Sequence, residues 1–168
     1  TQALRKWCLR RHESFLSTDE PAPDKIVSQV YAYACFLEGL LPVAALEQDS
    51  ARALQFGILQ IENLLGEYSE EYQRCDVIAQ LLRLRLYADN YGVMELDYNS
   101  AAEEAAVVEA FQMQSPDPKI DGGFAFAREN GEIILDMNPT ATIFAIQALS
   151  MWDEGQQGAF RDPWETLI

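Results

Sequence analysis

Three polar residues fall on one face of a mostly apolar segment between residues 71 and 90. Asp76, Gln80 and Arg83 are spaced so that an α-helix places them side by side. In a cavity, Asp76 would serve as a general acid or base, and Arg83 would bind an anionic group of a substrate beside Gln80. The alternative is that Asp76 occupies the first helical turn, where the helix dipole favours a carboxylate, and that the other two face solvent.

A second set of candidate substrate-binding residues lies in the segment 24–41, which contributes Tyr33 and Glu38. Aromatic rings hold sugars by stacking and isoprenoids by burial, whereas core packing is the alternative role for these side chains. His12 is the single histidine, the three cysteines are scattered, and no pair of potential ligands has zinc-site spacing. We therefore expect no metal and no other cofactor, and we expect His12 to be a solvated residue of a basic helix.

Hydrophobic periodicity and turn residues predict helices joined by short connections. The predicted helices span residues 3–17, 24–41, 50–65, 71–90, 101–114 and 139–153. The segments 24–41 and 139–153 are apolar on most faces, so we expect them to be inner helices of a two-layered arrangement. Ser100 and Glu103 have the spacing of a capping box, and Asn138 is a favourable N-cap.

The composition is that of a globular protein, and 168 residues predict a single helical domain over 1–168 of the all-α class. Net charge is −15, which disfavours a nucleic-acid partner. No apolar run is long enough for a membrane span. Three widely spaced cysteines favour reduced thiols and a cytoplasmic location. We expect the apolar residues of the tail, from Phe160 to Ile168, to pack onto the domain.

A family resemblance is carried by the stretch 107–152. Its characteristic residues are Gln114 at the end of a helix, the turn Asp121-Gly122-Gly123-Phe124, Asn138 at the next helix start, and Gln147 within that helix. This pattern resembles the repeat of the squalene-hopene cyclase and protein prenyltransferase superfamily. The resemblance implies antiparallel helical hairpins in a complete or partial α/α toroid, with a short hairpin-like loop near 121–136.

Physical chemistry favours a structural role for the residues of this turn. Gly122 and Gly123 allow backbone angles that side chains forbid, and Asp121 can accept hydrogen bonds from amides of the turn. Phe124 can fill the gap between hairpins, and a buried Gln114 can bond the ends of neighbouring helices. The acidic D-x-D-D motif and the zinc-ligand set of the superfamily are both missing, so the resemblance implies the fold and neither activity.

Two functional classes remain open. The first is a module of an α/α-toroid protein that handles a carbohydrate or an isoprenoid-like small molecule in a central cavity, either as an enzyme or without catalysis. The rest of the toroid, or a second copy of the chain, would then be the partner. The second is a non-catalytic helical scaffold for protein–protein interaction, which an extended apolar surface patch would favour.

Overall fold

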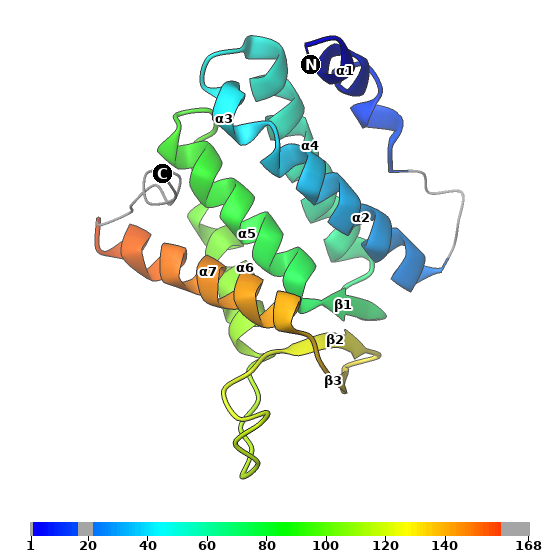
Figure 1. Cartoon of the computed structure of the whole chain (residues 1–168), viewed down its shortest axis with the longest axis vertical. Coiled ribbons are helices and arrows are strands. Elements are labelled where there is room, and N and C mark those ends of the chain that lie inside the picture. Colours follow the sequence, from blue (N-terminus) through cyan, green and yellow to red (C-terminus); the bar gives the residue numbers. More distant parts are fainter. Residues whose placement is uncertain (1, 17–21, 159–168) are drawn as a thin grey trace.

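One helix, α5 (Cys75–Asn90), lies at the centre of the fold (Figure 1). The computed structural model describes residues 2–16 and 22–158, so the predicted packing of the tail from Phe160 to Ile168 lies outside the described residues. From Cys75 to Ala88, Arg83 is the single residue that is not fully buried. A helix enclosed on all sides is the core of the domain.

Four longer helices surround α5 and contact it. These are α2 (Pro23–Glu38), α4 (Gln48–Glu67), α6 (Tyr98–Glu109) and α7 (Pro139–Gln156). The prediction that the segment 139–153 is an inner helix is wrong, because Ile143 and Ile146 are 53% and 52% exposed. The enclosed helix is α5. The sequence does not indicate its burial, because α5 contains charged residues, and these are buried as ion pairs with other side chains.

The all-α prediction is wrong, because three strands form an antiparallel sheet in the order β1-β2-β3. The strands are β1 (Tyr72–Arg74), β2 (Ala125–Glu129) and β3 (Glu132–Met137). Asn130 and Gly131 join β2 to β3 with positive φ angles of 49° and 82°, as an Asn-Gly hairpin turn requires. The hairpin-like loop expected near 121–136 therefore contains two of the three strands of this sheet, and the class is mixed α and β rather than a ring of helical hairpins.

Several predicted helix boundaries also differ from those of the structure. The segment 3–17 forms α1 (Gln2–Leu9) and, after a turn, the short 3₁₀ helix η1 (His12–Ser14), whereas 24–41 divides into α2 and α3 (Leu41–Ala44). The start of 71–90 is β1. The capping box predicted at Ser100 is wrong, because the N-cap is Asp97, whose Oδ1 accepts hydrogen bonds from the backbone amides of Asn99 at 3.0 Å and Ser100 at 3.2 Å.

The double-glycine turn has the backbone that its sequence predicts. Gly122 has a φ of 74°, and a Cβ on Gly123 would lie 2.5 Å from Cε of Met137. Asp121 accepts a hydrogen bond through Oδ1 from the backbone amide of Ser115 at 2.9 Å. Phe124 is 3% exposed, so this turn is anchored to the core by its aromatic residue.

The glutamines of the resemblance do not have the buried role expected for them. Gln114 lies beyond the end of α6 and is exposed, and Gln147 is exposed on α7. A different residue, Gln112, donates a hydrogen bond from Nε2 to the carbonyl of Gly122 at 3.2 Å. Asn138 is confirmed as the N-cap of α7, since its Oδ1 accepts a hydrogen bond from the amide of Thr140 at 2.8 Å.

Candidate functional site

Two of the three polar residues predicted on one face of α5, Gln80 and Arg83, contact side chains of α2. Gln80 is fully buried and donates a hydrogen bond from Nε2 to Sγ of Cys35 at 3.4 Å. Arg83 forms an ion pair with Glu38, with 3.1 Å between Nη1 and Oε1, and its guanidinium lies 5.1 Å from the ring centroid of Phe144. Burial raises the pKa of Glu38, although Arg83 and Gln80 oppose the shift. The structure therefore brings together Gln80, Arg83 and Glu38, three of the candidate substrate-binding residues.

Asp76 is held apart from that group by its own ion pair. It is 1% exposed and binds Arg74 through two contacts, from Nη2 to Oδ2 at 2.6 Å and from Nε to Oδ1 at 3.0 Å. The Arg74 guanidinium lies 5.0 Å from the ring centroid of Tyr31 and 4.5 Å from that of Phe126. Asp76 occupies the first turn of α5, as the alternative interpretation holds. The ion pair between Arg74 and Asp76 therefore links β1 to the first turn of α5. The other part of the alternative interpretation is wrong, because Gln80 is fully buried and the Arg83 side chain is only 12% exposed, so neither faces solvent.

Tyr33 lies elsewhere, next to the only histidine of the chain. A hydrogen bond of 2.9 Å joins its hydroxyl to Nδ1 of His12. The prediction that His12 is solvated is wrong, because the residue is 7% exposed. Burial lowers the pKa of His12, with Glu13 opposing the shift, and burial raises the pKa of Tyr33. At neutral pH the pair is therefore an uncharged imidazole and an intact phenol.

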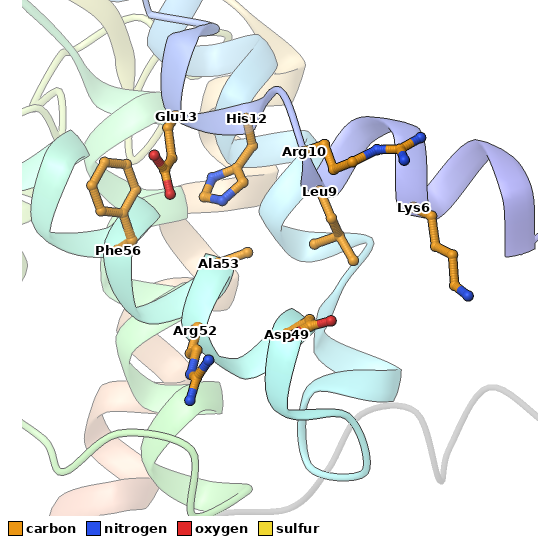
Figure 2. Close-up of a pocket in the computed structure, with 9 residues that line it drawn as sticks. All are labelled: Lys6, Leu9, Arg10, His12, Glu13, Asp49, Arg52, Ala53 and Phe56. Carbon is orange, nitrogen blue, oxygen red and sulfur yellow. The ribbon is translucent and has the colours of Figure 1, made fainter.

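A pocket of about 560 Å³ opens beside His12, between the α1–η1 segment and the first half of α4 (Figure 2). We call it the His12 pocket. Its lining consists of Lys6, Leu9, Arg10, His12, Glu13, Asp49, Arg52, Ala53 and Phe56. The His12 and Phe56 rings meet edge to face at 5.5 Å between centroids. The pocket thus combines an apolar floor with three cationic and two anionic side chains.

A second pocket, of about 410 Å³, shares His12 as a lining residue. Its walls are mainly aromatic, with Trp7, Phe15, Tyr33 and Phe36. The rings of Phe15 and Phe36 stack on Tyr33 at centroid distances of 5.8 and 6.0 Å. The His12 side chain therefore lies between two pockets, one lined mainly by aromatic rings and the other, the His12 pocket, lined in part by charged side chains.

This site is not visible in the sequence because its contacts join distant segments. His12 and Tyr33 are 21 positions apart, and Phe56 lies on a third helix. Helical periodicity describes single helices and cannot show that an aromatic face of α2 meets η1. The available signal was the density of aromatic residues around the only histidine.

No protein-family model, curated protein or solved structure matches the chain. The resemblance to the cyclase and prenyltransferase superfamily therefore stays a prediction. In residues 2–16 and 22–158, no three His, Cys, Asp or Glu side chains gather closely enough to hold a metal ion. Among the described helices, none combines the length and apolar character needed to cross a bilayer.

Proposed function

We propose that this chain is a ligand-binding module whose His12 pocket takes an amphipathic organic anion, such as an isoprenoid-like chain with a phosphate or carboxylate head. The observation that carries the proposal is the gathering of three cations beside an apolar floor in a protein of net charge −15. Lys6, Arg10 and Arg52 form no ion pair with another described residue. Their charges are therefore available to an anion.

The two acidic residues of the pocket do not cancel this preference. Asp49 occupies the first turn of α4, where the helix dipole stabilises its carboxylate. Burial lowers the pKa of His12 and the charge of Glu13 only partly opposes that shift, so the Glu13 carboxylate lies within electrostatic reach of the imidazole. The three cations thus leave the lining with one net positive charge, from Lys6, Arg10 and Arg52 against Glu13 and Asp49.

The apolar part of the ligand follows from the floor of the pocket. Leu9, Ala53 and Phe56 offer aliphatic and aromatic surface, and the aromatic pocket on the other side of His12 offers more. Burial of such surface contributes about 25 cal/mol per Å². Of the two ligand classes expected from the sequence, this apolar floor supports the isoprenoid-like class, because it offers a surface on which a hydrocarbon chain can be buried.

Calorimetry with three matched probes tests this proposal. Geranyl diphosphate carries both the chain and the head, geraniol carries the chain alone, and inorganic pyrophosphate carries the head alone. We expect geranyl diphosphate to bind at least about tenfold more tightly than either half, because both interactions contribute. Raised salt should weaken its binding, since the rim charges are screened. Equal affinities for the three probes would refute the proposal.

Two substitutions locate the binding in this pocket. Arg52→Gln removes a rim cation and should weaken geranyl diphosphate binding about tenfold while leaving geraniol unaffected. Phe56→Ala should weaken both. Lys119→Gln is the matched control, because Lys119 is an exposed cation in the loop between α6 and β2, outside the pocket. An equal effect of Arg52→Gln and Lys119→Gln would mean that net charge alone attracts the anion.

The second candidate function is a scaffold for protein–protein interaction. It is favoured by apolar side chains exposed on consecutive elements, with Leu135 of β3 at 76%, Ile143 of α7 at 53% and Ile146 of α7 at 52%. Sedimentation velocity compares the chain with Ile143→Asp/Ile146→Asp. A concentration-dependent shift that the double substitution abolishes would support this function, and an unchanged monomer at high concentration would count against self-association.

A further inference from the structure

The N-terminal segment, residues 2–16, contains α1 and η1 and lies at the edge of the domain (Figure 1). Among the side chains of this segment that the structure describes, only His12 and Leu16 are buried. The ion pair of Arg5 with Glu47 joins two partly exposed side chains, and pairs of this kind contribute little stability. The attachment of the N-terminal segment to the rest of the chain therefore depends strongly on His12.

The imidazole of His12 is enclosed by groups from two other helices. Its hydrogen bond to Tyr33 and the ring of Phe36, 6.3 Å away between centroids, come from α2. The ring of Phe56, in edge-to-face contact, comes from α4. These three side chains carry no charge at neutral pH, so none of them would neutralise an imidazolium. One ionisable side chain thus joins η1 to both α2 and α4.

Two pockets separate much of the N-terminal segment from the helices beneath it. The His12 pocket lies between the segment and α4, and the aromatic pocket lies between the segment and α2. Figure 2 shows the first of these spaces, with His12 and Phe56 at one end and Lys6 at the other. Apolar packing is therefore interrupted on both sides of His12. Local opening of such a segment breaks few buried contacts, so it needs less free energy than global unfolding.

The neutral form of His12 is the one that this environment favours. The titratable group of α2 that faces the imidazole is Tyr33. The charged side chains lining the two pockets come from the N-terminal segment and α4, and they are Lys6, Arg10, Arg11, Glu13, Asp49 and Arg52. Burial lowers the pKa of His12, and the charge of Glu13 partly opposes that shift. Protonation of the enclosed imidazole is therefore unfavourable.

We propose that the N-terminal segment is a pH-sensitive latch, which is closed on α2 and α4 while the His12 imidazole is neutral and opens when the imidazole gains a proton. An imidazolium favours the open state because water hydrates its charge there. The pKa of His12 in the closed state lies below its ordinary value of 6.5. The stability linked to His12 is therefore fully present above pH 6.5 and is lost as pH falls through the lowered pKa. One proton is involved, so the ratio of closed to open molecules changes at most about tenfold for each pH unit.

The latch does not depend on a ligand. Its opening would remove one wall of both pockets, and release of a bound anion at low pH would follow from it only through the function proposed above. Opening is measured on the free protein, so either proposal can fail without the other.

NMR on the unsubstituted chain provides the test, because its single histidine gives one imidazole signal. We expect this signal to titrate with a midpoint below pH 6.5. One pH unit above the midpoint, the amide order parameters of residues 2–16 should be about 0.85, and one unit below it they should fall under about 0.6, whereas those of α5 should stay high.

Three results would overturn the proposal. The first is a midpoint at or above pH 6.5, and the second is the same order parameters of residues 2–16 on both sides of the midpoint. The third is a loss of order in α5 as well, since the whole domain would then be unfolding.

Two substitutions test whether His12 is the group responsible. His12→Phe keeps a ring among those of Tyr33 and Phe56 but cannot be protonated, so the N-terminal segment should stay ordered at both pH values. Glu13→Gln removes the charge that opposes the lowering of the His12 pKa, so the imidazole midpoint and the loss of order should both move to lower pH. Glu109→Gln removes an exposed carboxylate of α6 and should move neither.

Glu13→Gln also decides the question should His12→Phe release the segment at neutral pH through loss of the hydrogen bond to Tyr33. A parallel shift of the imidazole midpoint and of the loss of order would support the latch. A shifted midpoint with an unmoved loss of order would mean that another group opens the segment, and this would overturn the proposal. Opening of an ordered His12→Phe variant on acidification, as in the unsubstituted chain, would do the same.

Discussion

Substitution of Glu104 by glutamine should change how the stability of this protein depends on pH. The carboxyl group has an ordinary pKa of 4.5 in the unfolded chain and a pKa of about 7 in the folded protein. The folded state therefore binds more protons than the unfolded state between these values, and the free energy of unfolding falls as pH rises through them. The stability linked to Glu104 is fully present below pH 4.5 and is lost by pH 8.

The magnitude follows from the size of the shift. One pKa unit corresponds to about 1.4 kcal/mol, so the full shift is worth about 3 kcal/mol, of which roughly 2.5 kcal/mol is lost between pH 5 and pH 8. Oε1 of Glu104 accepts a hydrogen bond from Nε of Arg85 at 2.7 Å. Glu104→Gln keeps an acceptor for Nε of Arg85 but has no proton to release. The free energy of unfolding of the variant should therefore depend less on pH by about that amount.

Urea unfolding at pH 5, 6, 7 and 8 provides the measurement, with Glu109→Gln as the control on the same helix. Other groups titrate equally in all three proteins, so the difference between the curves isolates Glu104. We expect the Glu104→Gln curve to cross or approach that of the unsubstituted chain as pH rises. Parallel curves would refute the argument that burial outweighs the ion pair with Arg85.

Three further outcomes follow from the packing. Gly57→Ala should lower the free energy of unfolding by about 1 to 3 kcal/mol in urea unfolding, because its Cβ would lie 2.5 Å from Cδ1 of Leu37, and an unchanged midpoint would contradict this contact. Asn138→Ala should cost about 1 kcal/mol in the same assay through loss of the cap of α7, whereas full stability would deny the cap its role. A thiol reagent at pH 8 should label the exposed Cys35 quickly and Cys75 slowly, since Cys75 is buried and burial raises its pKa to about 12; equal labelling rates would show that α5 opens readily.

The local features of the fold follow from the sequence where one short segment contains the whole signal. Asn138 followed by a proline marks the start of α7, because the cap, the fixed φ angle and the helix are adjacent. Gly122 and Gly123 likewise mark a turn, since the backbone angle of the first and the close contact of the second exclude a side chain. These features need no knowledge of the rest of the chain.

The sheet could not be predicted in this way, because its pairing is not local. β1 has three residues, and it pairs with β2 across more than fifty intervening positions, with Tyr72 opposite Glu129. A strand of that length has no detectable alternation of apolar and polar residues. The sequence therefore predicts these residues as the first turn of the following helix, since β1 ends where α5 begins. The hairpin alone carried a visible signal, in Asn130 and Gly131.

The candidate sites show the same difference between features that lie within one helix and contacts that join distant segments. The sequence predicts the face formed by Gln80 and Arg83 because both residues belong to one helix. It does not predict the ion pair of Arg83 with Glu38 on α2, nor the separate ion pair of Asp76 with Arg74. His12 was assigned to solvent because its neighbours in sequence are basic, whereas its neighbours in space are Tyr33 and Phe56. Both chemistry and burial depend here on contacts between helices.

The ion pairs of α5 explain how a central helix of this composition finds a unique arrangement. Arg83 pairs with α2 through Glu38, and Arg85, two residues later and therefore on another side of the helix, pairs with α4 and α6. Buried ion pairs add little net stability, but rotation of α5 about its axis would leave both guanidinium groups unpaired in the core. Arg85→Met alone should then cost about 3 to 5 kcal/mol, because Glu104 loses its partner, whereas Arg85→Met/Glu104→Leu should recover most of that loss. Urea unfolding of the single and double variants distinguishes this from simple packing: additive losses would mean that apolar contacts, and not the charges, orient the helix.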